Sequence, residues 1–214
     1  AHQRVYDPVI QAVAGFAWAQ GGGGEPQLVR TIASDKVAAL TASQAISAAL
    51  LARARGTARG HHVELSMLDA SLQFLWPEVY WNHSHLEEDG FVRKPLISDF
   101  YRLLPTKDGF VTIIVVGDDE FRGCCRGLDI LPLQDDPRFQ TLSDRFARYA
   151  ELFEEFAKGA CKLSTEEVVV RMDREGVPCA RVNTFDDVIA DPRVNCRNSI
   201  IEYDHPSGGR LRQP

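Results

Sequence analysis

The residue best suited to do chemistry in this sequence is Asp35, which lies where a long Ala-rich segment begins. A carboxylate at the start of a helix is held as an anion by the positive end of the helix dipole, and Lys36 adds a positive charge beside it. The anion is the form in which a carboxylate acts as a nucleophile. Aspartate also commonly caps helices for stability alone. The residues by themselves therefore leave two roles open for Asp35, nucleophile and helix cap.

The element that positions Asp35 is a predicted helix over residues 36–55. Ala and Leu dominate this segment, and both favour helix. Ser34 and Asp35 are N-cap residue types, and Gly56 is typical of a helix end. We therefore expect Ser34 or Asp35 to cap the helix, whose first turn can also offer backbone amides to a developing oxyanion.

The flanking segments predict an α/β layer. Residues 5–18 are apolar with helix-like spacing, and the QGGGGEP segment at 20–26 interrupts them, because consecutive glycines lose much entropy in regular structure. Residues 61–66 alternate as in a strand. Residues 67–85 predict a second helix that Pro77 bends or interrupts. Helix, glycine turn, strand and helix follow one another as in α/β proteins.

The second half of the sequence predicts a separate, smaller unit after a charged linker. A hairpin is expected from two apolar segments joined by the Asp108-Gly109 turn. Ser164 and Glu167 form a capping box before another helix. The strands are expected at 99–105 and 110–116, and the helices at 118–127, 144–161, 165–175 and 185–190.

Composition excludes several classes of protein. The chain has 214 residues, 44% hydrophobic and 25% charged, as in ordinary folded proteins. Its 24 basic and 30 acidic residues give a net charge of −6, which argues against a nucleic-acid partner. No uninterrupted apolar segment approaches the roughly 20 residues that cross a bilayer, so we expect no membrane partner.

The cysteines and histidines indicate neither disulfides nor a metal. Five cysteines without a CxxC pair are expected to be reduced, structural thiols of a cytoplasmic protein. Four histidines lie close together in sequence, but no Cys or carboxylate set has ligand spacing beside them. We therefore expect no metal site at His61, His62, His83 and His85.

Residues 28–40 (LVRTIASDKVAAL), the Ala-rich helix after them and residues 66–70 (SMLDA) resemble the class III CoA-transferase family. Formyl-CoA transferase, carnitine CoA-transferase and α-methylacyl-CoA racemase are members of it. The second half carries similar landmarks in the family's order, which makes the resemblance specific. These are Tyr101 leading to Asp-Gly at 108–109, DPRF at 136–139, GVPC at 176–179 and HPSG at 205–208.

The resemblance implies an α/β fold in which residues 1–88 are the end of a Rossmann-like large domain. Residues 89–196 would then form a small α/β domain, and residues 197–214 a segment returning towards the large domain. Family members begin with a nucleotide-fold half that has no counterpart here, so we expect the chain to be a fragment. They are interlocked dimers, which implies a homodimer for the full-length protein.

The resemblance also implies a reaction, an acyl-CoA:carboxylate CoA transfer. Asp35 would attack the thioester carbonyl of an acyl-CoA and form an aspartyl mixed anhydride, and a carboxylic acid would then accept the coenzyme A. Arg4 would face a phosphate of coenzyme A, with Tyr6 and Asp7 in the wall of the active site and Met67 near the pantetheine arm. From the residues alone, a surface or core position explains Tyr6 better than a site role, and it explains Arg4 equally well. A Met that opens an apolar helix, as Met67 does, usually packs in the core.

Two alternatives to the transferase remain. A 2-methylacyl-CoA racemase belongs to the same family, and Asp118 occupies the place of a racemase acid near the substrate, although a helix N-cap explains Asp118 as well. Racemases usually carry glycines after the catalytic acid, whereas this sequence has Lys36 and Val37. The second alternative is a non-catalytic assembly or binding fragment. The sequence favours transfer over racemisation.

Overall fold

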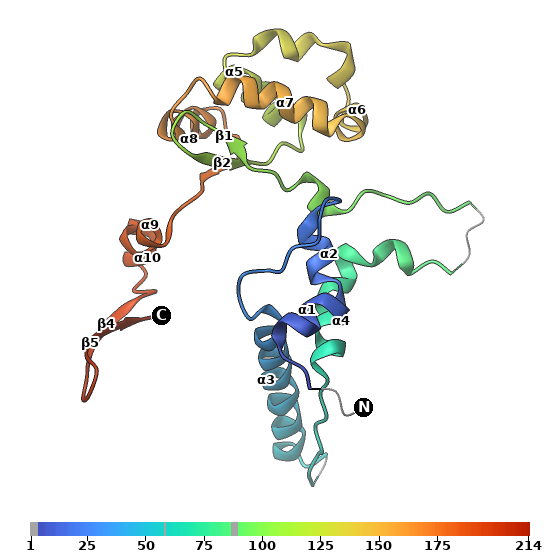
Figure 1. The fold of residues 1–214 in the computed structure, drawn as a ribbon, viewed down its shortest axis with the longest axis vertical. Helices are drawn as coiled ribbons and strands as arrows, with labels where there is room; N and C mark the ends of the chain where they lie inside the picture. The colour runs from blue at the N-terminus through green and yellow to red at the C-terminus, as the bar shows by residue number, and fades with distance from the viewer. Residues whose placement is uncertain (1–3, 58, 87–89) are drawn as a thin grey trace. The chain divides into compact units, whose positions relative to one another are not determined.

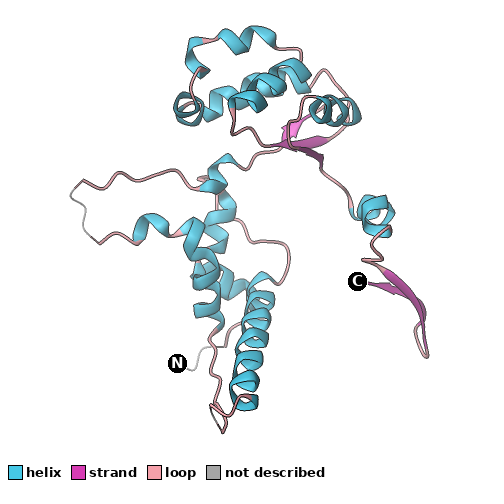
Figure 2. Ribbon diagram, turned by 180° about the vertical axis from the view of Figure 1, so that it is seen from behind, coloured by secondary structure: helices cyan, strands magenta, loops and turns pink. Residues whose placement is uncertain are grey.

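The fold is described by a computed structural model, which places residues 4–57, 59–86 and 90–214 (Figure 1). The chain divides into two units, Ala1–Tyr101 and Arg102–Pro214. Among the described residues all strands belong to the second unit (Figure 2), so the chain as a whole is mixed α/β as expected. This division by contacts lies after Tyr101, whereas the domain boundary expected from the family resemblance lies after residue 88. The expected domain boundary stays a prediction.

The first unit is built on three packed helices. Helix α1 packs against both α3 and α4, and α3 packs against α4. The buried core of this unit is small and consists of Ile10 and Ala14 of α1, Phe16 of α2 and Leu75 of α4, with Val37 of α3 packed against it. The helices of this unit are α1 (Asp7–Ala14), α2 (Phe16–Gly21), α3 (Ala33–Ala54) and α4 (Met67–Val79), with short 3-10 turns η1 (Trp81–His83) and η2 (Ile97–Phe100).

The break between α1 and α2 lies at Gly15, which has a φ of +92°. A side chain there would collide with the hydroxyl group of Tyr80, which donates a hydrogen bond to the carbonyl of Ala14 at 2.8 Å. Glycine fits both the backbone and the space. The expected loss of regular structure over the QGGGGEP segment begins two residues late, because Gln20 and Gly21 still belong to α2.

Helix α3 ends as predicted but begins differently. Gly56 has a φ of +71°, and its amide and that of Thr57 donate to the carbonyls of Arg53 and Ala52, which is the Schellman pattern. At the other end the helix begins at Ala33, and the N-cap position is Ile32, whose side chain makes no capping hydrogen bond. The prediction that Ser34 or Asp35 caps α3 is therefore wrong, since both lie inside the first turn.

The predicted strand at residues 61–66 is absent. A strand needs a hydrogen-bonded neighbour, and no described strand pairs with this segment, which connects α3 to α4 as an irregular link. The second predicted helix is present and shorter than expected. Its N-cap is Ser66, whose Oγ accepts the amide of Asp69 at 3.2 Å, and Pro77 lies inside it near its end.

Helix α3 also qualifies, by length and composition alone, as a helix able to cross a membrane, although core helices of soluble proteins meet the same criteria. The expectation that no segment is long enough to cross a bilayer rested on uninterrupted apolar residues alone, whereas α3 qualifies by its average hydropathy. Several large apolar side chains of α3 are at least half exposed: Leu40, Ile46, Leu50 and Leu51.

The second unit places helices around a small antiparallel sheet of order β1-β2-β3. Val111 of β2 pairs with Leu104 of β1 and with Arg181 of β3. The hydrophobic core of the second unit is larger than that of the first and includes Phe139, Leu152 and Phe156. The main elements are β1 (Leu104–Pro105), β2 (Phe110–Ile113), α5 (Asp118–Gly127), α6 (Leu142–Ala147), α7 (Tyr149–Ala160), α8 (Thr165–Arg174) and β3 (Cys179–Arg181).

The Asp108-Gly109 hairpin turn, the helix at 118–127 and the Ser164–Glu167 capping box are confirmed. The strands of the hairpin are shorter than expected: the predicted strand at 99–105 is present only as β1 at 104–105, with residues 99–100 in η2, and β2 ends at Ile113 instead of residue 116. In place of the single helix expected over 144–161 there are two helices, α6 and α7, which are separated by Arg148. Two short 3-10 turns, η3 (Leu131–Asp135) and η4 (Pro137–Phe139), precede α6. After β3 come α9 (Phe185–Ala190), α10 (Pro192–Asn195) and a hairpin of β4 (Ile201–His205) and β5 (Gly209–Gln213).

Candidate active site

Asp35 lies in the first turn of α3 with an exposed side chain. Lys36, the next residue, is also exposed, and its Nζ donates to the hydroxyl oxygen of Thr31 at 3.1 Å. The ammonium group thus lies against the segment that leads into the helix. The carboxylate of Asp35 is therefore accessible from solvent at the positive end of a 22-residue helix.

The cap of α3 comes from a different helix. Asp7, the first residue of α1, is only 4% exposed, and its Oδ1 accepts the backbone amides of Ser34 at 2.7 Å and of Asp35 at 3.2 Å. Two of the unpaired amides that begin every helix are thereby satisfied by a side chain 27 residues or more away in sequence. Asp7 therefore does the capping that the sequence analysis assigned to Ser34 or Asp35.

The amides on either side of these two, those of Ala33 and Lys36, are also paired. The amide of Ala33 donates to the carbonyl of Thr31 at 2.8 Å, and that of Lys36 donates to the carbonyl of Ile32 at 3.1 Å. The amides of residues 33–36 therefore all have acceptors, so they are not the free oxyanion donors that the sequence led us to expect. The physical reason is the buried carboxylate of Asp7, which already accepts the amides nearest to Asp35.

Gln11 completes the arrangement around Asp7. It lies one helical turn after Asp7 on α1, is 1% exposed, and its Nε2 donates to Oδ2 of Asp7 at 2.6 Å. The same side chain binds the segment before α3, because Oε1 accepts the amide of Val29 at 2.9 Å and Nε2 donates to the carbonyl of Thr31 at 2.9 Å. Asp7 and Gln11 thus hold both the beginning of α3 and the chain that enters it.

Gln11 was not predicted from the sequence, although its spacing from Asp7 is a signal for it. Residues four apart share one face of a helix, so Gln11 is expected beside Asp7 on the face of α1 that also carries Ile10 and Ala14. A glutamine on a buried helix face needs polar partners, which this position supplies from the segment at 29–31.

The other predicted site residues are placed differently from one another. Arg4 is exposed, and Tyr6 is 74% exposed at the N-cap position of α1, directly beside Asp7. Met67 is partly buried at the start of α4 and packs against the core of the first unit. The structure therefore brings Asp7 to Asp35, leaves Tyr6 and Arg4 open to solvent, and gives Asp7 buried structural contacts. The expected roles of Arg4, Tyr6, Asp7 and Met67 at the coenzyme A site stay predictions.

All 214 residues match the model of one protein family, which is described as CoA-transferase family III. The chain belongs to this family. The resemblance found in the sequence is thereby confirmed.

The named relatives of this family III chain are CoA-transferases. It is 26% identical to succinate–glutarate CoA-transferase of Agrobacterium fabrum over 95% of its length, and 24% identical to succinyl-CoA:glutarate CoA-transferase of Homo sapiens over 98%. It covers 51% and 48% of these two proteins. The family III chain thus spans about half the length of the relatives that it matches.

Solved structures agree with the fold. A CAIB/BAIF family protein from Brucella suis is 28% identical, with a TM-score of 0.77, and Rv3272 from Mycobacterium tuberculosis is 20% identical, with a TM-score of 0.80. Each match covers 99% of this family III chain and 56% of the solved chain. The likeness to Rv3272 concerns the fold alone.

Asp118, the residue considered as a racemase acid, is engaged in an ion pair in this family III chain. Its carboxylate accepts a hydrogen bond from Arg145, a residue that is 3% exposed. Arg145 also donates to the carbonyl of Phe139 at 3.1 Å, and its guanidinium lies 4.8 Å from the ring centre of Phe121. The hydrogen bond from Arg145 lowers the pKa of Asp118. Asp118 therefore remains ionised as the partner of a buried cation.

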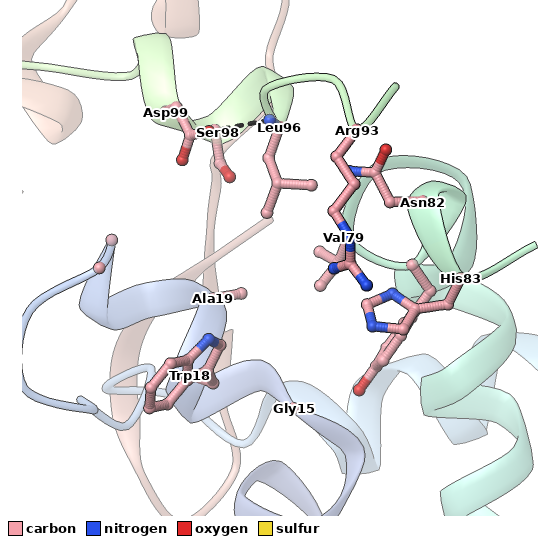
Figure 3. A pocket seen from close by; sticks show the side chains of 13 residues that line it. Gly15, Trp18, Ala19, Val79, Asn82, His83, Arg93, Leu96, Ser98 and Asp99 are labelled. Atoms are coloured by element: carbon pink, nitrogen blue, oxygen red, sulfur yellow. Dashed lines mark hydrogen bonds between the residues drawn. The ribbon is translucent and has the colours of Figure 1, made fainter. Parts of the chain in front are cut away.

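A cavity of about 350 Å³ lies in the first unit of the family III chain (Figure 3). It is lined by residues of α2, the end of α4 and the segment that leads to η2, with the side chains of Trp18, His83 and Arg93 around it. Arg4, Tyr6, Asp7, Asp35 and Met67 are not among its lining residues.

The remaining groups that could do chemistry are the cysteines and the possible metal ligands. All five cysteines are free, and burial raises the pKa of Cys125 to about 12 and that of Cys179 to about 11. Such thiols stay protonated and are poor nucleophiles at neutral pH. Within the described parts of the family III chain, no group of three or more His, Cys, Asp or Glu residues is arranged to hold a metal ion.

Proposed function

We propose that the full-length protein transfers coenzyme A from an acyl-CoA to a carboxylic acid, with Asp35 as the nucleophile. The observation that carries this proposal is the capping of α3 by Asp7. Capping was the structural explanation for an aspartate at this position, and Asp7 already performs it. The exposed carboxylate of Asp35 is therefore available for a reaction, and the names of the relatives support CoA transfer.

The proposed reaction begins with attack of an Asp35 carboxylate oxygen on the thioester carbonyl carbon. The carbon–sulfur bond breaks, the CoA thiolate leaves, and an aspartyl mixed anhydride remains. The thiolate then attacks the aspartyl carbonyl, which releases the donor acid and leaves an aspartyl thioester. The acceptor carboxylate displaces the thiolate from it, and attack of this thiolate on the acceptor acyl carbon yields the new acyl-CoA and free Asp35.

The chain contributes the nucleophile and its support to this reaction. A carboxylate is a weak nucleophile, so its alignment with the thioester contributes much of the rate. The reaction also requires hydrogen-bond donors for the oxyanion. In our account these donors are groups other than the amides of residues 33–36, which already donate to Asp7, Thr31 and Ile32. Arg4, Tyr6 and Met67 remain our candidates for contact with coenzyme A.

The acceptor class follows from the names of relatives. These name transferases of glutarate, D-citramalate and oxalate, which are all dicarboxylic acids. We propose a carboxylic acid as acceptor and dicarboxylates as the first compounds to assay. We also propose a cytoplasmic homodimer for the full-length protein, on the basis of the family resemblance.

Racemisation is the competing reaction, and isotope exchange distinguishes the two. Full-length enzyme is incubated with a 2-methylacyl-CoA and a dicarboxylate in deuterated water. Transfer predicts coenzyme A on the dicarboxylate without deuterium at the α-carbon, because no step removes the α-proton. Rapid α-deuteration without transfer to any added acid would overturn the proposal and favour the racemase. Absence of both reactions in a folded full-length protein would favour the non-catalytic binding alternative.

A further inference from the structure

We propose that Asp7 and Gln11 are positioning residues that hold Asp35 in its reactive orientation. We call the two side chains the α1 clamp. This inference rests on the proposed function, because it concerns how the nucleophile is aligned. Its structural part, the immobilisation of the first turn of α3, is measurable independently of activity.

The α1 clamp is buried and fully committed to the segment that carries Asp35. Asp7 is 4% exposed and Gln11 is 1% exposed. Asp7 accepts hydrogen bonds on both carboxylate oxygens, from two α3 amides on Oδ1 and from Gln11 on Oδ2. All three donors are neutral amide groups. The negative charge of Asp7 lies at the positive end of α3, where the helix dipole stabilises it.

The contacts of the α1 clamp fix the backbone on both sides of the bend that leads into α3. Gln11 holds the amide of Val29 and the carbonyl of Thr31, and Asp7 holds the amides of Ser34 and Asp35. The direction of a side chain is set by the backbone at its own residue. Because the Asp35 amide is itself held, the clamp sets the direction in which the Asp35 carboxylate leaves the helix.

Alignment of this kind has a large effect on rate. A nucleophile displaced by about 1 Å from the attack geometry costs up to about 100-fold in rate. The effect is expected in kcat, because Asp7 and Gln11 are buried and so offer acyl-CoA almost no surface to contact. A purely structural role would lower the amount of folded enzyme and leave the turnover of the folded fraction unchanged.

The test variant is Gln11→Met, which removes the hydrogen bonds of Gln11 while preserving side-chain length. Its matched control is Tyr80→Phe, which removes the hydrogen bond from Tyr80 to the carbonyl of Ala14 at the other end of α1. Both variants are made in the full-length enzyme. The measurements are kcat and KM per folded enzyme and hydrogen exchange of the peptide covering residues 29–36.

We expect Gln11→Met to lower kcat by about 10-fold to 100-fold, to change KM for acyl-CoA less than about threefold, and to speed exchange at residues 29–36. Tyr80→Phe should leave both kcat and this exchange near wild type. Faster exchange with kcat within about twofold of wild type would overturn the positioning role. Unchanged exchange with a folded Gln11→Met protein would overturn the clamp itself.

A second variant covers the case in which Gln11→Met does not fold. Asp7→Asn keeps an acceptor for the α3 amides but sets its own amide NH2 group against that of Gln11, so a smaller loss of kcat with the same KM is expected. Asp35→Asn separates this inference from the proposed function. Wild-type turnover in Asp35→Asn would refute Asp35 as the nucleophile, and with it the claim that the α1 clamp positions a nucleophile. Hydrogen exchange at residues 29–36 in Gln11→Met would still test whether the α1 clamp holds the first turn of α3.

Discussion

Oδ1 of Asp7 lies 3.2 Å from the backbone nitrogen of Asp35, so one aspartate holds the main chain of the other. The two carboxylates consequently have different environments. Asp7 is buried and accepts three hydrogen bonds, whereas Asp35 is exposed on the turn that Asp7 supports. This division separates the task of stabilising the helix from the task of reacting with a substrate.

The ion pair between Asp118 and Arg145 predicts different effects of two substitutions. Asp118→Ala leaves the buried guanidinium with carbonyl partners only, and an uncompensated buried charge is unfavourable. Asp118→Asn keeps an acceptor. We expect a lower melting temperature for Asp118→Ala than for Asp118→Asn, measured by differential scanning calorimetry. Turnover of the folded full-length enzyme should be preserved in Asp118→Asn, and a loss above about tenfold would indicate the racemase-type role for Asp118.

The stability of the chain should fall in acid. The pKa of Asp108 lies below its ordinary value of 3.8, mainly because the carboxylate accepts the backbone amide of Thr165. The pKa of Glu167 lies below its ordinary value of 4.5, mainly because its carboxylate accepts the backbone amide of Ser164. A lowered pKa in the folded state stabilises it above the unfolded pKa, and this contribution is lost as the pH falls through the folded pKa. Denaturation midpoints should therefore be level above about pH 5 and decrease below it.

Asp108→Asn is the matched variant for this pH dependence. The Asp108 carboxylate accepts the amide of Thr165 at 2.7 Å and so joins the hairpin turn to the start of α8. Asparagine does not titrate, so the variant should lose less of its stability between pH 6 and pH 3 than the wild type does, in parallel urea titrations. An equal or steeper acid dependence in Asp108→Asn would contradict the assignment.

The cysteines should differ in reactivity according to their burial. Cys161 and Cys196 are exposed, whereas Cys124 and Cys125 are buried and their pKa values are raised by burial. Brief treatment with iodoacetamide near pH 8 should alkylate the first two only, as read by peptide mass spectrometry. Labelling of all four should require denaturant. Modification of Cys125 in the folded chain would show that the second unit opens more readily than this core indicates.

Local patterns were sufficient for most of the fold. The capping box at Ser164 and the Asp108-Gly109 turn are each defined by neighbouring residues, and both are present in the structure. The segment at 61–66 was wrongly predicted as a strand, because alternation shows only that a strand is compatible with the residues. Whether a strand forms depends on a partner strand distant in sequence.

The candidate site shows the same distinction. Asp35 was found from its position at the start of the Ala-rich helix, which is a local signal. The capping role of Asp7 was not found, because it joins residues 27 and 28 positions apart and depends on how α1 packs against α3. Gln11 had a local signal, its spacing from Asp7, but its partners at Val29 and Thr31 are again tertiary.

The central claim, that the Asp35 carboxylate carries the acyl group, is tested most directly by trapping. Full-length enzyme is mixed with an acyl-CoA and then with hydroxylamine, which converts an activated aspartyl carbonyl into a hydroxamate. The hydroxamate is heavier than the acid by one NH group, about 15 mass units. The account predicts this modification on the peptide that contains Asp35 in the wild type, and its absence in Asp35→Asn and in enzyme without acyl-CoA. Full acyl transfer by Asp35→Asn, or a hydroxamate on a different residue, would contradict it.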